Sequence, residues 1–276
     1  MDKAKILADN IKFHNYIADN YDDLHSSEFF ISSNQGRLDK LICNFASMCK
    51  GERFLDVGCG TGHLSKIANR HFKMCVGVDI SEAMLKKARS CINKLAFADI
   101  LQLPFKEDSF DMIGCHAVLH HLSDPFLFVK TACGLLRPGG ILFTDYDLNA
   151  LSPKYFPTIV RFRRTLFRVF PFSIIKGGLY KYYNYKKPDN QRAKKIEKIK
   201  KSDSELQRLW AQSNIQHSEN EGFNPYELKS ILSEAGFRQT NVFVYVYDGL
   251  RDRVSERKVN FLTSRIYPLI YTYSIK

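Results

Sequence analysis

Short apolar runs and helical patterns alternate along the middle of the chain. Five runs have the composition of buried strands: RFLDV (53–57), KMCVGVDI (73–80), KLAFAD (94–99), FDMIGCHA (110–117) and ILFTDYD (141–147). The segments between them carry apolar residues at helical spacing, with Ser81 and Asp124 at positions typical of N-caps. Strands that alternate with helices at this spacing predict a doubly wound parallel sheet.

The flanking parts of the chain are patterned differently. Residues 1–24 and 35–49 show helical spacing without a strand signal, and residues 224–237 form one more helical pattern. Two β-branched and aromatic runs close the chain, TNVFVYVYDG (240–249) and YPLIYTYSI (267–275), and predict two final strands. A chain of 276 residues accommodates one large α/β domain with an insertion.

Composition narrows the class of protein. No apolar run reaches the roughly 18 residues of a membrane span, and the N-terminal MDKAKILADNIKFHNY lacks the apolar core of a secretory signal. The seven cysteines are odd in number, form no CxxC pair and lie mostly in apolar contexts, which suits reduced, buried thiols. We therefore expect a cytoplasmic protein whose cysteines bind no metal.

The stretch FLDVGCGTG (54–62) raises the first chemical question. Gly58, Gly60 and Gly62 alternate between a predicted strand and a predicted helix, where parallel sheets bind their ligands. The spacing G-x-G-x-G differs from the G-x-G-x-x-G of dinucleotide sites, and Asp56 precedes it. An acid beside the loop disfavours a phosphate and favours a cationic ligand.

Carboxylates follow the next two predicted strands. Asp79 ends the second strand, where an acid can accept hydrogen bonds from both hydroxyls of a ribose. Asp99 ends the third and precedes Ile100 and Leu101, so a carboxylate for an exocyclic amine stands beside apolar cover for a purine. These features predict a ligand with a ribose, an adenine and a positively charged, phosphate-free tail, a description that S-adenosylmethionine fits.

The chain resembles the class I S-adenosylmethionine-dependent methyltransferases, especially the subgroup that includes quinone and small-molecule methyltransferases. The matching segments are FLDVGCGTG, VGVDIS, FADILQLPF, SFDMIGCHAVLHHLSDP and GLLRPGGILF, with YIADNYDDLH upstream similar to the subgroup's entry segment. Residues 16–147 match well, and 148–222 match no part of the family. The resemblance implies a Rossmann-like, seven-stranded, mostly parallel sheet with an antiparallel last strand, N-terminal helices and a helical insertion after strand 5.

The resemblance also implies roles for single residues. The methionine part would lie against Gly58 and Gly60, Asp56 would orient its amino group, and Tyr16 or Tyr21 would close over the cofactor. The implied cofactor-binding set is Tyr21, Asp56, Gly58, Gly60, Asp79, Ile80, Asp99, Ile100 and His116.

Several of these positions have structural alternatives. Gly62 is better explained as a helix-packing glycine than as a contact. Asp56 could mainly cap the loop amides, and Tyr21 could staple the N-terminal helix to the core.

Methyl transfer asks the protein mainly to hold a nucleophile in line with the methyl carbon. A base is needed only if the acceptor must lose a proton. The candidates, which follow the fourth and fifth strands, are His116, His120 and Tyr146, with His121, Asp145 and Asp147 beside them. Structural or cofactor-lining roles remain open for the histidines. Because no carboxylate cluster accompanies them, no metal is expected.

The basic charge of the chain is concentrated after the fifth strand. Residues 151–201 hold 15 Lys and Arg and two acids, and the rest of the chain is close to neutral although the whole carries +12. Within TIVRFRRTLFRVF (158–170), apolar residues share one helical face and most arginines the other, as in interfacial membrane helices. We hypothesise a lid that touches anionic membrane and admits a small or lipid-like acceptor.

The basic segment is also compatible with roles away from a membrane. Its apolar face could pack on the main domain under a soluble lid, or its basic and aromatic residues could bind RNA, the less favoured partner. A cofactor-binding regulator without catalysis is a further alternative. The expected organisation is one methyltransferase domain: a helical cap (1–49), the cofactor-binding core (50–147), the basic aromatic lid (148–222) and the last helix with the closing strands (223–276).

Overall fold

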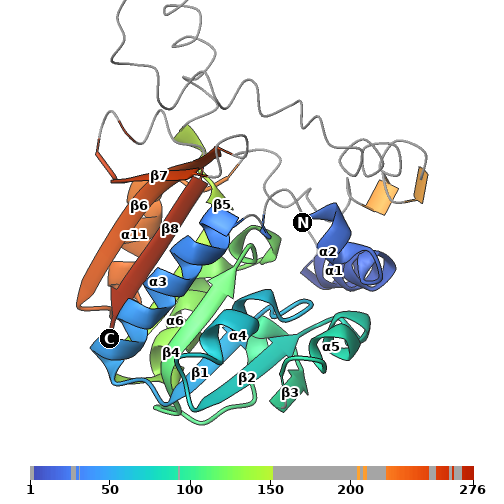
Figure 1. Ribbon diagram of the computed structural model, residues 1–276, viewed down its shortest axis with the longest axis horizontal. Coiled ribbons are helices and arrows are strands. Elements are labelled where there is room, and N and C mark those ends of the chain that lie inside the picture. Colours follow the sequence, from blue (N-terminus) through green and yellow to red (C-terminus); the bar gives the residue numbers. More distant parts are fainter. Residues whose placement is uncertain are drawn as a thin grey trace, which may run out of the picture.

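The computed structural model describes most of the chain outside the basic aromatic lid (Figure 1). The described residues are 3–25, 29–30, 32–92, 94–151, 204–205, 208–209, 222–248, 253–260, 263 and 269–276. The predicted amphipathic helix at 158–170 and almost all of the lid lie outside these ranges. Within the described part, no helix is long and apolar enough to cross a membrane.

An eight-stranded sheet with the order β3-β2-β1-β4-β5-β8-β6-β7 forms the centre of the molecule. Its strands are β1 (Arg53–Val57), β2 (Met74–Asp79), β3 (Lys94–Phe97), β4 (Phe110–His116), β5 (Leu136–Leu148), β6 (Gln239–Asp248), β7 (Arg253–Lys258) and β8 (Leu269–Ile275). The first five pair in parallel, and β8 runs antiparallel to both β5 and β6. This confirms the predicted doubly wound α/β fold with its antiparallel closing part.

Helices cover both faces of the sheet (Figure 1). The helical elements are α1 (Lys3–Ile17), α2 (Tyr21–Leu24), α3 (Ser32–Cys49), α4 (His63–Ala68), α5 (Glu82–Ala88), α6 (Pro125–Leu135) and α11 (Pro225–Glu234), with short 3-10 turns η1 (Ile100–Gln102) and η2 (Leu119–His121). Helices α3 and α4 bury one cluster of apolar side chains against the sheet, and α6 and α11 bury another against its opposite face. These two clusters form the largest part of the described core, because each sheet face is apolar and must be covered.

The strand order places the site. Strands β2 and β4 lie on either side of β1, so the chain leaves β1 in one direction and later returns on the other side. At such a reversal the connections diverge and leave a crevice at the carboxyl ends of the strands. The loops after β1, β2, β3 and β4 all open at this edge.

The sequence-based expectation of seven strands is wrong by one. Strand β7 was missed because its sequence, RVSERK, lacks the apolar run that identified the others. Among the described strands it pairs with β6 alone, at the end of the sheet, where a polar sequence suits an edge strand. Strand β5 also begins at Leu136, five residues before the predicted start, because Leu136 already pairs with Phe110 ahead of a register shift.

Candidate functional site

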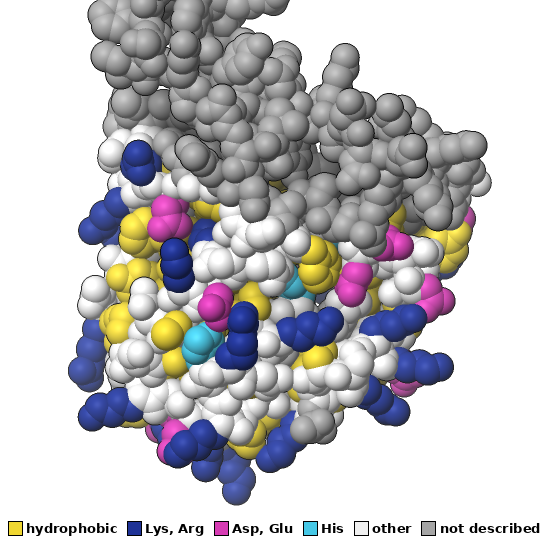
Figure 2. Space-filling model, viewed as in Figure 1, with side chains coloured by type: hydrophobic (Ala, Val, Ile, Leu, Met, Phe, Trp, Pro, Cys, Tyr) yellow, Lys and Arg dark blue, Asp and Glu magenta, His cyan; other side chains and the backbone are white. Residues whose placement is uncertain are grey.

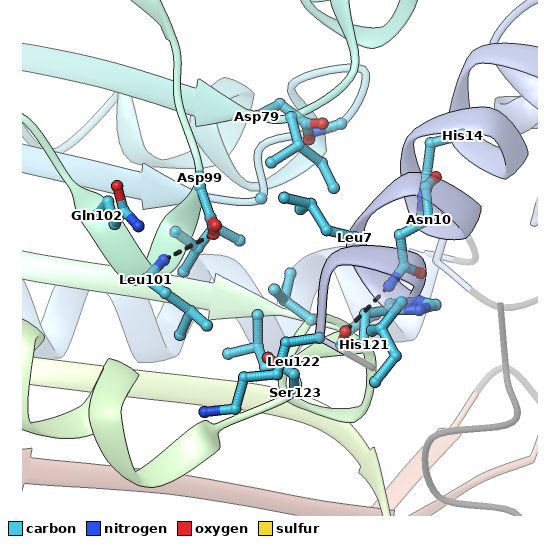
Figure 3. A pocket seen from close by; sticks show the side chains of 18 of the residues that line it. Leu7, Asn10, His14, Asp79, Asp99, Leu101, Gln102, His121, Leu122 and Ser123 are labelled. Carbon is cyan, nitrogen blue, oxygen red and sulfur yellow. Dashed lines mark hydrogen bonds between the residues drawn. The ribbon is translucent and has the colours of Figure 1, made fainter. Parts of the chain in front are cut away.

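A cavity of about 330 Å³ lies at the carboxyl edge of the sheet (Figure 3). The loops after β1, β2, β3 and β4 line it, and α1 contributes most of the remaining wall, with Tyr21 of α2 and Leu127 of α6. The volume falls within the range of small-molecule sites, about 300–1,000 Å³.

The glycine loop brings backbone to the cavity. Gly58 and Gly60 line it and have φ angles of +67° and +52°, a region that residues with a Cβ rarely adopt. A Cβ on Gly58 would collide with Val118, whereas one on Gly60 would meet nothing within 4 Å. Gly62, at φ +87°, lies against Cys91 and Ile92 and is not among the lining residues. This packing supports the interpretation of Gly62 as a helix-packing glycine.

Asp79 ties the glycine loop to the end of β2. Its Oδ2 accepts a hydrogen bond from the Gly60 amide at 2.8 Å and its Oδ1 accepts one from the Ser81 amide at 2.9 Å. Burial raises the pKa of this carboxyl, and the neighbouring His14 opposes the shift. The carboxylate is thereby fixed in the cavity wall with acceptor positions left for the hydroxyls of a ribose.

The third strand end supplies the second acidic group. Asp99 and Ile100 line the cavity, as does Ile80 after β2. The Oδ1 of Asp99 caps η1 by accepting a hydrogen bond from the Leu101 amide at 2.9 Å. This bond holds the side chain at the cavity edge beside apolar Ile100, the environment expected for a purine and its amine.

Asp56 lies outside the cavity lining. Its Oδ2 accepts hydrogen bonds from the Ser65 amide at 2.9 Å and from the Ser65 hydroxyl at 2.5 Å, which fix the first turn of α4. The side chain is 1% exposed, and burial raises its pKa to about 7. The structure thus gives Asp56 a capping role under the loop, the alternative left open by the sequence.

Tyr21 and Tyr16 differ in position. Tyr21 lines the cavity and packs against His25 and Phe29. Tyr16 is 45% exposed and does not line it. Of the two tyrosines considered for closing over the cofactor, only Tyr21 lies in place for that role.

His116 joins the cavity to a second cluster of rings. It lines the cavity at the end of β4, and its ring lies 5.4 Å from His63, 5.6 Å from Tyr146 and 4.9 Å from Phe29. Phe29 also meets Tyr146 edge-on at 4.7 Å. Burial lowers the pKa of His63 to about 3 and that of His116 to about 4. Both imidazoles are therefore neutral at pH 7. We call these four residues the imidazole–aromatic cluster.

Two residues of this region have a positive φ angle, which is unusual for residues other than glycine. Tyr146 has φ +67° at an irregularity in the pairing of β5 with β8, and Ala117, directly after His116, has φ +59°. Such conformations cost about 1–3 kcal/mol each and concentrate at functional sites. Here the bend at Tyr146 directs its ring against His116.

A buried ion pair supports the cluster from behind. Arg37 of α3 donates from both terminal nitrogens to Asp145 at 3.0 and 2.9 Å, and Tyr245 donates to the same carboxylate at 2.8 Å. Burial alone would raise the pKa of Asp145, but Arg37 lowers it below its usual value. The Nε2 of His116 lies 3.6 Å from Asp145 Oδ2 and makes no hydrogen bond among the described residues. The carboxylate thus faces the edge of the imidazole.

His120, the second histidine proposed as catalytic, does not line the cavity. The Nδ1 of His120 pairs with Asp147 Oδ1 at 2.9 Å. Of the proposed catalytic residues, the structure brings His116 and Tyr146 together and leaves His120 apart. Among the described residues, no group of three or more His, Cys, Asp and Glu could hold a metal.

Sequence reasoning missed the residues that reach this edge from distant elements. Asn10 and His14 come from α1, and Arg37 comes from α3. The helical pattern at the N-terminus predicted α1 but gave no sign of which face meets the sheet edge. An arginine inside a mixed polar sequence likewise gives no sign that a carboxylate 108 positions later will bind it.

The cavity suits an adenosyl cofactor. Its wall has open space at Gly60, carboxylates at Asp79 and Asp99 for hydroxyl and amine donors, and apolar cover at Ile80 and Ile100. This set of acceptors and apolar side chains fits the ribose and the adenine of S-adenosylmethionine.

Comparison with known proteins agrees with this fit. Residues 55–144 match the family model described as a methyltransferase domain. A ubiquinone biosynthesis O-methyltransferase of Coxiella burnetii is 31% identical over 145 residues, which are 50% of this chain and 59% of that protein. The 27-O-demethylrifamycin SV methyltransferase of Amycolatopsis mediterranei is 31% identical over 126 residues, 42% of this chain and 46% of that protein. The alignments thus span about half the length of these curated relatives.

The fold comparison extends over nearly the whole chain. The crystal structure of magnesium protoporphyrin IX methyltransferase from Synechocystis PCC 6803, with bound SAH, superposes with a TM-score of 0.52 and 15% identity, covering 98% of this chain and 99% of that one. Together, the match over residues 55–144, the strand order and the cavity identify a methyltransferase domain of the class I fold in this part of the chain, with a cavity that fits S-adenosylmethionine as the cofactor.

Proposed function

We propose that the protein methylates a hydroxyl group of a small planar acceptor that binds at the imidazole–aromatic cluster. The observation that carries the proposal is the position of His116, which lines the cofactor cavity and is also a member of the cluster. The relatives' names, a ubiquinone biosynthesis O-methyltransferase and a demethylrifamycin methyltransferase, support oxygen on a small molecule as the methyl acceptor.

The chemistry of the cluster favours an uncharged, ring-shaped acceptor. Phe29 and Tyr146 offer edges and faces for stacking, and the two histidines are neutral. Arg37, the cation beside Asp145, is bound to that carboxylate by two short hydrogen bonds, so it already has a partner for its charge. A phenolic ring suits this environment better than a phosphate or a carboxylate does.

S-adenosylmethionine, when bound, supplies the activated methyl group. The protein must hold the acceptor oxygen in line with it, and alignment of this kind contributes several kcal/mol of rate enhancement. A hydroxyl also loses its proton during the transfer. His116 accepts that proton in our proposal, and Asp145, 3.6 Å from its Nε2, stabilises the imidazolium that forms. Tyr146 holds the ring of His116 in place by stacking.

Access to the acceptor site is the part of the proposal that rests on sequence alone. We propose that the basic aromatic lid covers the acceptor side and contacts anionic membrane, and that the protein is cytoplasmic and peripherally membrane-associated. The +13 net charge of residues 151–201 supports this, as does the near-neutral remainder of the chain. Figure 2 shows Lys, Arg, Asp and Glu side chains mixed on the described surface.

Methyl-label transfer tests the proposal. Labelled S-adenosylmethionine is incubated with the protein and a cell extract, which is then separated into lipid, aqueous, RNA and protein fractions. We expect alkali-stable label in the lipid or aqueous small-molecule fraction, and strongly reduced label with Asp79→Asn at low cofactor concentration and with His116→Gln. Label in the RNA fraction would mean that the acceptor is RNA and would contradict a small-molecule acceptor. Cofactor binding without label in any fraction would favour a regulatory role.

A further inference from the structure

Helix α1 presents one face to the cofactor cavity. Lys3, Leu7, Asn10 and His14 all line the cavity and recur at spacings of three and four residues, so they share a face of the helix. Figure 3 shows this face opposite Asp79 and Asp99, with Leu7 reaching between the two walls. The helix therefore forms part of the binding site and does not only cap the domain.

Asn10 carries a buried acceptor atom without a partner. The residue is 3% exposed, and its Nδ2 donates to the His121 carbonyl at 3.1 Å (Figure 3). Since a carbonyl can only accept, this bond fixes which end of the amide is the nitrogen. The opposite atom, Oδ1, is buried and makes no hydrogen bond among the described residues. An unpaired buried amide oxygen costs about 1–3 kcal/mol, so its retention beside a ligand cavity points to a donor that arrives with the ligand.

His14 adds a second acceptor one turn further along α1. Its Nδ1 lies 2.9 Å from the Asn10 carbonyl oxygen, which requires a hydrogen on Nδ1. Burial lowers the pKa of His14, so the ring is neutral and Nε2 is left as an acceptor. The Asp79 carboxylate is close enough to act on the charge of this ring. His14 and Asp79 therefore border the same part of the cavity.

Polar contacts hold α1 across the cavity from both sides. On the β2 side, Asn15 Oδ1 accepts a hydrogen bond at 2.7 Å from the hydroxyl of Ser81, the N-cap of α5. On the β4 side, Asn10 binds the carbonyl of His121, and Lys3 pairs with Asp124 at 3.3 Å. The helix spans the opening between the two strand ends that the cofactor must reach.

We propose that α1 is a cofactor-binding strap: Asn10 Oδ1 and His14 Nε2 accept hydrogen bonds from S-adenosylmethionine, and cofactor binding fastens α1 over the cavity. The donors available on this ligand are the ribose hydroxyls beside Asp79 and the amine groups. Leu7 covers the adenosyl moiety from the same helix. This inference concerns the cofactor only, so it stands apart from the acceptor proposed above.

Calorimetry and hydrogen exchange on the full chain test the strap without any turnover. S-adenosylhomocysteine is the titrant, because it has the ribose and amines but transfers no methyl group. We expect Asn10→Ala to raise its Kd about tenfold or more. We also expect the ligand to slow amide exchange across residues 3–17 in the wild type, and to do so much less in Asn10→Ala.

Asn15→Ala is the matched control. Asn15 lies on the same helix and makes a docking hydrogen bond, but it does not line the cavity. It should loosen α1 in the free protein about as much as Asn10→Ala does and change the Kd less than threefold. If Asn10→Ala binds S-adenosylhomocysteine as tightly as the wild type, or no more weakly than Asn15→Ala, the acceptor is satisfied by water and the strap is overturned. Ligand-independent exchange in α1 would overturn it as well.

Discussion

The two halves of the sheet edge differ in the groups that line them and in what those groups are suited to bind. On the side of β1, β2 and β3, the cavity wall is backbone and carboxylate, built from glycines with positive φ and from Asp79 and Asp99. On the side of β4 and β5, the wall is a set of rings around His116, supported by the Arg37–Asp145 ion pair. The first half can bind one cofactor in a fixed way. In our proposal the second half binds the acceptor, and exchange of its side chains would change which acceptor binds.

The two halves also differ in how their residues are distributed along the sequence. In the cofactor half, each strand and the loop after it deliver their own functional residues: Gly58 and Gly60 follow β1, Asp79 ends β2 and Asp99 follows β3. The acceptor half gathers Phe29, Arg37, His116, Asp145 and Tyr245 from five separate elements or loops. Its stability therefore depends on tertiary contacts, and breaking one of them should affect folding more than cofactor affinity.

The largest effect is expected from Arg37→Met. The guanidinium is 6% exposed and lies 4.0 Å from the ring of Tyr245, so its removal leaves the buried Asp145 carboxylate without a counter-charge. Breaking one side of a buried pair typically costs about 3–5 kcal/mol. We expect a loss of this size in the free energy of unfolding, measured by urea denaturation. The double variant Arg37→Met, Asp145→Asn should recover part of it, because no charge is then left buried. Equal stability of the wild type and the single variant would contradict the interpretation.

The variants Asp79→Asn and His116→Gln test whether the cofactor half and the acceptor half have separate functions. Asp79→Asn should weaken S-adenosylhomocysteine binding by about 10- to 100-fold, since hydrogen bonds to a charged group contribute roughly 1.5–3 kcal/mol. His116→Gln should leave that Kd within threefold and lower kcat once an acceptor is known. Calorimetry measures the first effect, and steady-state kinetics measures the second. A large rise in Kd for His116→Gln would mean that the two halves act as one site.

The glycine loop offers a smaller contrast within the cofactor half. Alanine at Gly62 must tolerate φ +87° and a collision with Cys91, so we expect a stability loss of about 1–3 kcal/mol with little change in cofactor affinity. Alanine at Gly60 should cost about 1–2 kcal/mol through its φ of +52° alone. Because Gly60 lines the cavity, that variant should also bind S-adenosylhomocysteine more weakly. Thermal denaturation with and without the ligand distinguishes the two glycines, and the opposite ranking would reverse their roles.

The same contrast explains how far the sequence could be interpreted. The strands, the parallel order and the cavity positions of Gly58, Asp79 and Asp99 followed from local patterns, because each strand end carries its own functional residue. Asp56 was harder, since nothing local distinguishes an acid that meets a ligand from one that caps Ser65.

In the acceptor half, local sequence patterns did not predict which residues contact one another. His116 stood out as a residue at a strand end, but its partners did not. The ion pair of Arg37 with Asp145 depends on α3 packing across the sheet, and the position of Tyr146 depends on an irregularity at the end of β5. The polar strand β7, whose Glu256 also reaches Arg37 at 3.3 Å, gave no strand signal either. Such contacts are set by the assembled fold and not by any short segment.

Acid titration gives the most specific test of the acceptor half. Burial lowers the pKa of His63 to about 3, against about 6.5 in an unfolded chain. Between pH 6 and 4 the unfolded state therefore binds one more proton at this site, and the free energy of unfolding should fall by up to about 1.4 kcal/mol per pH unit as the pH drops.

His63→Phe should remove that contribution and leave the ring contacts of His63 with Phe29 and Phe30 largely filled. Urea denaturation at pH 7, 6, 5 and 4.5 gives the slope of the unfolding free energy against pH for the wild type and for the variant. The slope of the variant should be shallower, by an amount that corresponds to at most one bound proton. Parallel slopes would mean that His63 takes up its proton in the folded state. Water would then reach the cluster, and a dry, neutral ring site would no longer distinguish the acceptor half from the cofactor half.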